Sequence, residues 1–181
     1  MADAFDTCLA FTLRAEGGYV DDPADPGGAT NMGITLATFR EWSDNPDLGA
    51  AQVQDMTLRI ARAIYRSLYW NPLRADALPV GVDLSVFDMG VNAGIWRSAR
   101  LLQRAIGFTG DEVDGCVGPE TLGAASKYDP RTLVNDLADR QADFYKSLAD
   151  FDTFGAGWLN RTEARRAAAL AIIDPAKTTI A

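Results

Sequence analysis

The chain contains no histidine among its 181 residues. Ser-His-Asp triads, Cys-His dyads and His-ligated zinc sites all require an imidazole, so these three kinds of catalytic site are excluded. Cysteine is almost as scarce. Cys8 and Cys116 form no CxxC pair, and a lone cysteine in an apolar run is usually a small buried hydrophobe. The composition therefore favours acid/base chemistry by carboxyl groups, which implies no metal and no organic cofactor.

Positive charge is also scarce, with 17 Lys and Arg against 25 Asp and Glu and a formal net charge of -8. This charge argues against non-specific binding to nucleic acid or an anionic membrane surface, although a localized basic stripe could still exist. No apolar run approaches the roughly 20 residues of a membrane span, and the N-terminus lacks the basic and apolar regions of a signal peptide. We therefore expect cytoplasmic synthesis of a soluble chain, which would need another protein to release it for extracellular work.

The first half of the chain combines short helices with a turn-rich segment. Apolar residues at helical spacing predict a helix over residues 2–14, which Gly17 and Gly18 can end. The stretch 19–35 is rich in Asp, Pro and Gly, which predicts a small irregular hairpin. A short helix is expected at 36–42. A longer one follows Asp55, a plausible N-cap, and we interpret its arginine face as solvated: Arg59, Arg62 and Arg66.

Beyond Pro79 the hydrophobic pattern is almost wholly helical. Pro119 and Pro130 each stand where the first residue of a helix is expected. Asn160 and Glu163 have the spacing of a capping box, which predicts that a last helix starts there and stops at 174–175. The layout is a small lobe with a hairpin, a connecting helix and an all-helical lobe, and the chain is long enough for one domain or two small ones.

Glu16 is the most unusual carboxyl residue in this pattern. It falls in phase with Phe5, Leu9 and Thr12, so it faces the core at the last turn of the first predicted helix. Desolvation and the negative end of the helix dipole both favour a protonated carboxyl group, as a general acid requires. The alternative is that Glu16 extends into solvent, as most glutamates at helix ends do.

Asp25 and Thr30 lie in the turn-rich loop that follows, and this loop can fold back over the helix end. An inverting glycosidase needs a second carboxylate that holds or deprotonates water, roughly 6.5 to 9.5 Å from the acid. Asp25 could fill this role, with the Thr30 hydroxyl as a water holder. The alternative for the aspartates of this loop is turn formation, because Asp before Pro is a common turn former.

Three further residues could contact sugar. Tyr19 and Trp70 could stack on sugar rings, and Trp70 ends the connecting helix that should line a cleft. Asn92 could donate to and accept from an acetamido group. Each aromatic residue could equally belong to the core.

One run of about twenty residues is similar to a known protein family. The run resembles the signature of family 108 of the glycoside hydrolases, muramidases found in phage and bacterial genomes. It comprises Glu16-Gly17-Gly18-Tyr19, Asp22-Pro23, Asp25-Pro26-Gly27-Gly28, Thr30-Asn31 and Gly33-Ile34-Thr35. The resemblance implies that Glu16 is the catalytic acid. Residues 87–94 and 114–121 resemble the C-terminal region that accompanies these enzymes and is described as peptidoglycan-binding.

The order of these residues also resembles phage-type lysozymes, in which a Glu ending the first helix, an Asp in the hairpin and a Thr form the site. The spacing from Asp25 to Thr30 is five here and six in that pattern. The likeness implies a mainly α (α+β) lysozyme-like bilobal fold. Its lobes would be residues 1–78, with Glu16 and the hairpin, and residues 79–181, all helical and peptidoglycan-binding-like, together one domain.

The function that these resemblances imply is hydrolysis of peptidoglycan between N-acetylmuramic acid and N-acetylglucosamine, by a phage- or prophage-type lysis enzyme. Glu16 would protonate the glycosidic oxygen, and Asp25 with Thr30 would place water or stabilise the oxocarbenium ion. A lytic transglycosylase and a non-catalytic wall-binding or virion component are the alternatives. The expected partners are peptidoglycan and a holin-type release protein, with no nucleic acid and no membrane span, and we expect a monomer.

Overall fold

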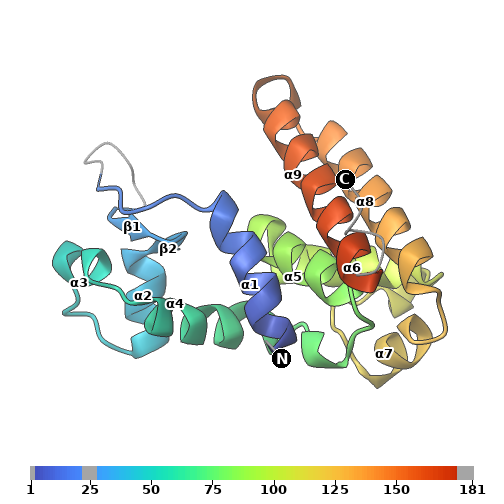
Figure 1. Ribbon diagram of the computed structural model, residues 1–181, viewed down its shortest axis with the longest axis horizontal. Coiled ribbons are helices and arrows are strands. Elements are labelled where there is room, and N and C mark those ends of the chain that lie inside the picture. The colour runs from blue at the N-terminus through green and yellow to red at the C-terminus, as the bar shows by residue number, and fades with distance from the viewer. Residues whose placement is uncertain (1–2, 22–27, 175–181) are drawn as a thin grey trace. The chain divides into compact units, whose positions relative to one another are not determined.

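The computed structural model describes residues 3–21 and 28–174, and these are mainly helical with one two-stranded antiparallel sheet (Figure 1). The expected fold class is thus confirmed. Shorter helical turns lie at Arg66–Trp70, Ala75–Ala77 and Gly110–Glu112. The helices and strands are α1 (Ala4–Ala15), β1 (Thr30–Asn31), β2 (Ile34–Thr35), α2 (Leu36–Ser43), α3 (Ala50–Gln54), α4 (Leu58–Tyr65), α5 (Val82–Ala93), α6 (Ile95–Ala105), α7 (Pro119–Ala125), α8 (Pro130–Lys146) and α9 (Phe151–Ile173).

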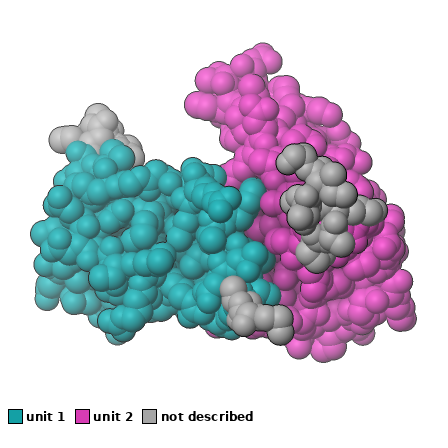
Figure 2. Space-filling view, in the orientation of Figure 1, with its two compact units in different colours: residues 1–68 teal, residues 69–181 magenta. Residues whose placement is uncertain are grey.

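The chain forms two compact units, Met1–Leu68 and Tyr69–Ala181, which Figure 2 distinguishes by colour. The contacts of the chain divide it after Leu68, whereas the sequence pattern suggested a division after residue 78. Unit 1 contains α1 to α4 and the hairpin, and unit 2 contains α5 to α9. Among the described residues, no helix combines the length and the hydropathy that a membrane span needs.

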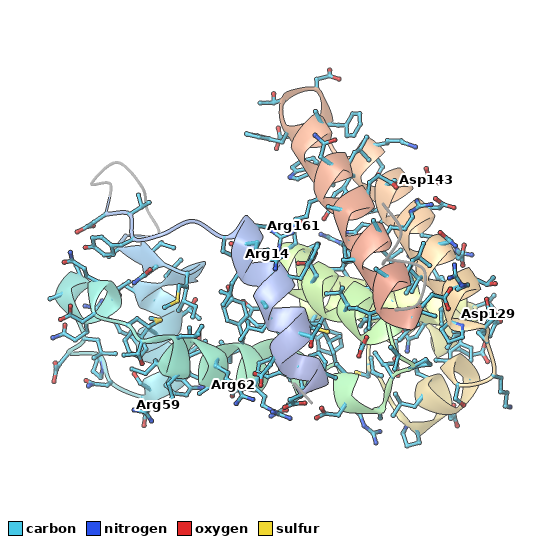
Figure 3. The ribbon with its side chains drawn as sticks, viewed as in Figure 1. Arg14, Arg59, Arg62, Asp129, Asp143 and Arg161 are labelled. Carbon is cyan, nitrogen blue, oxygen red and sulfur yellow. The ribbon has the colours of Figure 1, made fainter. Side chains whose placement is uncertain are left out.

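In unit 1, α4 is joined to α1 by charged side chains. The Arg62 Nε donates to Asp6 Oδ1 at 2.5 Å, and the Arg66 Nη1 donates to Asp3 Oδ2 at 3.0 Å. Both guanidinium groups lie over the Phe5 ring, 5.2 and 5.0 Å from its centroid. The side chains of Arg62 and Arg66 are still 39% and 32% exposed, and Arg59 is exposed as well (Figure 3), so this face is solvated as expected while two of its arginines also pair with α1.

The start of α4 also differs from the sequence expectation. Thr57 is the N-cap, and its hydroxyl oxygen accepts from the amide of Ile60. Asp55 instead ends α3, a helix of five residues that the hydrophobic pattern did not predict. A helix this short has too few residues to show helical periodicity, so only its contacts with β1 and α2 reveal it.

Unit 2 is built around α5. The residues from Val82 to Gly90 are all buried, and α5 packs against α6, α8 and α9. A helix that is buried on nearly all sides is expected at the centre of a helical unit. The helices α8 and α9 lie side by side and share the most extensive contact of the molecule (Figure 1).

The predicted ends of the helices in unit 2 are mostly confirmed. Pro119 and Pro130 are the first residues of α7 and α8, and the Asp129 carboxylate caps α8 by accepting from Thr132. The last helix ends at Ile173, as expected, but it begins at Phe151, so the prediction of a capping box at Asn160 and Glu163 was wrong. Tertiary packing explains the extra turns, because Gly155 is buried within α9 despite the low helix propensity of glycine.

Candidate active site

Glu16 is the first residue beyond α1 and is half-buried. Its φ of -87° and ψ of 138° are extended, so the chain leaves the helix at this residue. Along α1, the buried positions Phe5, Cys8, Leu9 and Thr12 lie on one face. The sequence placed Glu16 in the last turn of this helix, whereas the structure places it one residue beyond the helix, as the C-cap.

The hairpin formed by β1 and β2 has a two-residue turn. The strands pair Thr30 with Thr35 and Asn31 with Ile34, which leaves Met32 and Gly33 as the turn. Both have positive φ, 49° and 73°, as in a type I′ turn. Glycine adopts this conformation without strain, whereas a left-handed methionine costs roughly 1–2 kcal/mol.

Gly33 brings this turn against the carboxyl group of Glu16. A Cβ atom placed on Gly33 would lie 2.8 Å from Oε2 and 3.0 Å from Cγ of Glu16, and 2.6 Å from the Tyr65 hydroxyl oxygen. Real Cβ atoms essentially never approach other atoms below 3.0 Å. The hairpin turn thus lies against the carboxyl group at the helix end, and only glycine fits between this group and the hydroxyl.

Two side chains hold the hairpin in this place. The Tyr65 hydroxyl donates to the Met32 carbonyl at 2.9 Å, and this tyrosine is only 1% exposed. The Asn31 amide donates to the carbonyls of Val53 and Gln54 at 3.0 and 3.1 Å. One strand is therefore tied to α3 and the turn to α4, so the strained turn has little freedom to move away from Glu16.

Thr30 lies in β1, at the start of the same hairpin. Its backbone pairs with Val20 in both directions at 2.8 Å, and its hydroxyl donates to the Gly28 carbonyl at 3.3 Å. The structure thus places Thr30 and Glu16 in elements that contact each other through Gly33. Asp25, the predicted second carboxylate, lies outside the described residues, and its role stays a prediction.

The three predicted sugar contacts have different environments. Tyr19 is half-buried; burial and the neighbouring Asp21 carboxylate, which accepts from its hydroxyl, raise the pKa of this tyrosine. Asn92 is exposed at the end of α5, and its Oδ1 accepts from the Tyr145 hydroxyl at 2.5 Å. Trp70 is 0% exposed and packs edge-on against Phe87, so it has no free face for a sugar. Its interpretation as a stacking platform is therefore corrected to a core role.

The sequence analysis did not identify three residues that border Glu16 in the structure: Met32, Gly33 and Tyr65. The signal for Gly33 was present, since Met32-Gly33 sits between two short strand patterns and glycine is typical of such turns. No signal marked Tyr65, because its hydroxyl meets a carbonyl 33 residues away in the chain. Of the described residues, no three acidic or cysteine side chains are placed to hold a metal ion.

Unit 2 contains a separate buried cluster of charges. Asp88 is 0% exposed and accepts from Arg161 Nη2 at 2.9 Å, while Nη1 of the 1% exposed Arg165 lies 3.7 Å from it. Burial lowers the pKa of Arg165, and the Asp88 carboxylate partly offsets this effect. Because the Asp88 carboxylate of α5 is shared by two arginines of α9, we interpret the cluster as a structural link between these helices.

Two protein families and a solved structure are similar to this chain. Residues 9–94 match the family described as "Glycosyl hydrolase 108", and residues 97–163 match the "Predicted Peptidoglycan domain". The solved structure of SagA from Brucella abortus is similar over almost the whole chain, with a TM-score of 0.82 and 39% sequence identity, covering 96% of this chain and 97% of that one. Comparison with curated proteins gives no significant match.

Proposed function

Because the chain belongs to the glycosyl hydrolase 108 family, we propose that it is an N-acetylmuramidase with lysozyme activity. Its substrate would be peptidoglycan, and the bond cleaved would join N-acetylmuramic acid to N-acetylglucosamine. The coarser role, a glycoside hydrolase acting on peptidoglycan, follows from the family and from the second matched domain. The observation that carries the proposal is the Glu16 carboxyl group, held at a helix end against the Gly33 turn.

In the proposed mechanism, Glu16 acts as the general acid and protonates the glycosidic oxygen. Contacts with the Gly33 turn limit the orientations of its carboxyl group, and such positioning favours proton transfer. Asp25 would place the attacking water or stabilise positive charge on the sugar, with the Thr30 hydroxyl as a further water contact. These two roles come from the sequence resemblance and from the position of Thr30 in the hairpin.

The proposed biological role is lysis of the cell wall. The chain would act on the wall after release by a holin-type protein. This role rests on the sequence resemblance alone. It is tested by expressing the chain with and without such a release protein and by following the turbidity of the culture.

Replacement of Glu16 by glutamine tests the catalytic proposal. Glu16→Gln keeps the size of the side chain but cannot supply the proton, so the rate of peptidoglycan solubilisation should fall about 10²–10⁴-fold. The matched control is Glu41→Gln, which alters an exposed carboxyl group on α2 of the same unit. Unchanged activity of Glu16→Gln would refute its role as the acid.

Mass spectra of the soluble fragments identify the reaction. Fragments ending in reducing muramic acid are expected, and they would support a muramidase. Asp25→Asn should then abolish activity as well. Fragments one water lighter, with anhydro ends, would instead identify a lytic transglycosylase, in which the muramic 6-hydroxyl group attacks and Asp25 is dispensable. If no fragments form, the remaining alternative is that the protein is a non-catalytic wall-binding or virion component.

A further inference from the structure

Unit 2 has a second candidate site, a groove between α6 and α8. It has a volume of about 650 Å³ and is lined by two aromatic and four arginine side chains, which we call the arginine groove: Trp96, Arg97, Arg100, Arg104, Arg140 and Phe144. A neighbouring hollow of about 520 Å³ shares Arg104 and Arg140. Sites of this size hold small organic ligands.

The charge of the arginine groove is opposite to that of the chain. Its four arginines and one carboxylate, Asp143, give a formal charge of +3, while the whole chain carries -8. Asp143 also has a partner, since Lys146 lies 3.1 Å from it. Arg97, Arg100 and Arg104 share one face of α6 at spacings of three and four residues, and none of them forms an ion pair within residues 3–21 and 28–174.

The guanidinium groups are held in place by their neighbours. Arg97 lies 4.4 Å above the centroid of the Phe144 ring, and Arg140 Nε donates to Asp136 at 2.8 Å. Arg100 is held near a turn at Gly115, where a Cβ atom would lie 3.2 Å from its Nε and 2.8 Å from Trp96. Cations that are already ordered lose less entropy when an anion binds.

A buried side chain in the core of unit 2 holds the Gly115 turn in place. The side chain of Gln103, which is 1% exposed, accepts from the Gly115 amide at 2.9 Å and donates to Asp114 Oδ1 at 2.6 Å. The hydrogen bond from Gln103 is the main cause that lowers the pKa of Asp114. The charge of Arg100 lowers it further. The φ of +83° at Gly115 is the left-handed conformation that favours glycine, so this residue sets how closely the turn approaches the groove.

Trp96 and Phe144 give the groove an apolar component. Trp96 is 57% exposed, which is unusual for so large an apolar side chain. Guanidinium groups bind carboxylates through paired N–H donors, and aromatic faces contact aliphatic chains. A ligand that combines several carboxylates with short aliphatic segments matches this lining.

We propose that the arginine groove binds the stem peptides of peptidoglycan through their carboxylate groups, an inference that rests on the proposed function. Of the six side chains that define the arginine groove, all but Trp96 fall within residues 97–163, the segment that matches the peptidoglycan domain. The stem peptides carry free carboxylates and alanine methyl groups, whereas the glycan strand offers hydroxyl and acetamido groups. Charge complementarity therefore favours the stem over the glycan as the occupant.

The test measures sedimentation of the protein with purified sacculi that have been stripped of attached anionic polymers. The full chain carries Glu16→Gln, so the sacculi remain intact. The double substitution Arg100→Gln/Arg104→Gln removes two exposed cations of the groove and should weaken binding at least about tenfold. The control, Arg59→Gln/Lys127→Gln, makes the same change in net charge at exposed positions outside the groove and should bind like the parent. Thermal unfolding should be equal in all three proteins.

Competition identifies the ligand. The free stem tetrapeptide should displace the protein from sacculi, and the same peptide with its carboxylates converted to amides should not. The proposal is overturned if the double variant binds like the control, if the amidated peptide competes equally, or if a peptide-free oligosaccharide competes and the tetrapeptide does not. It is also overturned if binding requires the attached anionic polymers. A failure of the muramidase proposal would appear separately, as unchanged hydrolysis by Glu16→Gln.

Discussion

Polar groups are held in place by different kinds of contact in the two units. In unit 1, the Glu16 carboxyl group is positioned by a few single contacts between short elements: the Gly33 turn, one tyrosine hydroxyl and one asparagine amide. In unit 2, long helices surround α5 and pair buried charges across their interface. The position of the candidate acid thus depends on local geometry, whereas the helices of unit 2 are linked by ion pairs in its core.

The largest expected effect is on the stability of unit 2. Asp88→Ala would leave the cations of Arg161 and Arg165 without their buried carboxylate, and loss of one partner of a buried pair costs about 3–5 kcal/mol. Denaturant unfolding measures this loss. The control is Asp139→Ala, which removes an exposed carboxylate paired with Arg166 and should cost about 1 kcal/mol or less. Equal losses in the two variants would remove the contrast between the units.

A smaller effect is expected in unit 1, and on activity rather than on folding. Gly33→Ala inserts a methyl group that collides with the Glu16 carboxyl group, and displacement of a catalytic group by about 1 Å costs on the order of 10²-fold in rate. The comparison variant is Gly28→Ala. Gly28 also has positive φ, at 66°, but among the described residues no atom outside its chain neighbours lies within 4 Å of its Cβ position. If both variants lose the same activity, backbone strain rather than contact with Glu16 is the cause.

The smallest effect is a pH dependence within unit 2. Burial raises the pKa of Asp83 above 3.8, despite hydrogen bonds from the amides of Leu84 and Gly81. The folded state therefore binds this proton more tightly than the unfolded state. The associated stability is complete below pH 3.8 and is lost as the pH rises through the raised pKa.

Asp83→Asn keeps an oxygen that can accept both amide hydrogen bonds but cannot ionise. Its melting temperature, relative to that of the parent protein, should thus increase from acidic to neutral pH. A difference that stays constant with pH would show that the pKa of Asp83 is the same in the folded and unfolded states, and burial would then not raise it. The measurement contrasts Asp83, a buried carboxyl group that accepts from backbone amides, with Asp88, which is paired with arginines.

The sequence predicted much of the fold and part of the site. Helices with strong periodicity or a clear proline start, such as α7 and α8, begin where expected. The start of α9 and the existence of α3 were not predicted, because buried glycine and short length hide the helical pattern. In the site, the position of Glu16 was predicted, whereas Trp70 was misassigned, since a tryptophan near a helix end can face either solvent or core.

By itself, the sequence determined the family, the candidate acid and the mainly helical class, because these depend on neighbouring residues and on repeats of three to four positions. Only the tertiary structure decided that Gly33 and Tyr65 border Glu16, that two arginines of unit 1 pair with α1, and that arginines of α6 and α8 line one groove. Those contacts join residues far apart in the chain, and helix packing, which local propensity does not encode, brings them together.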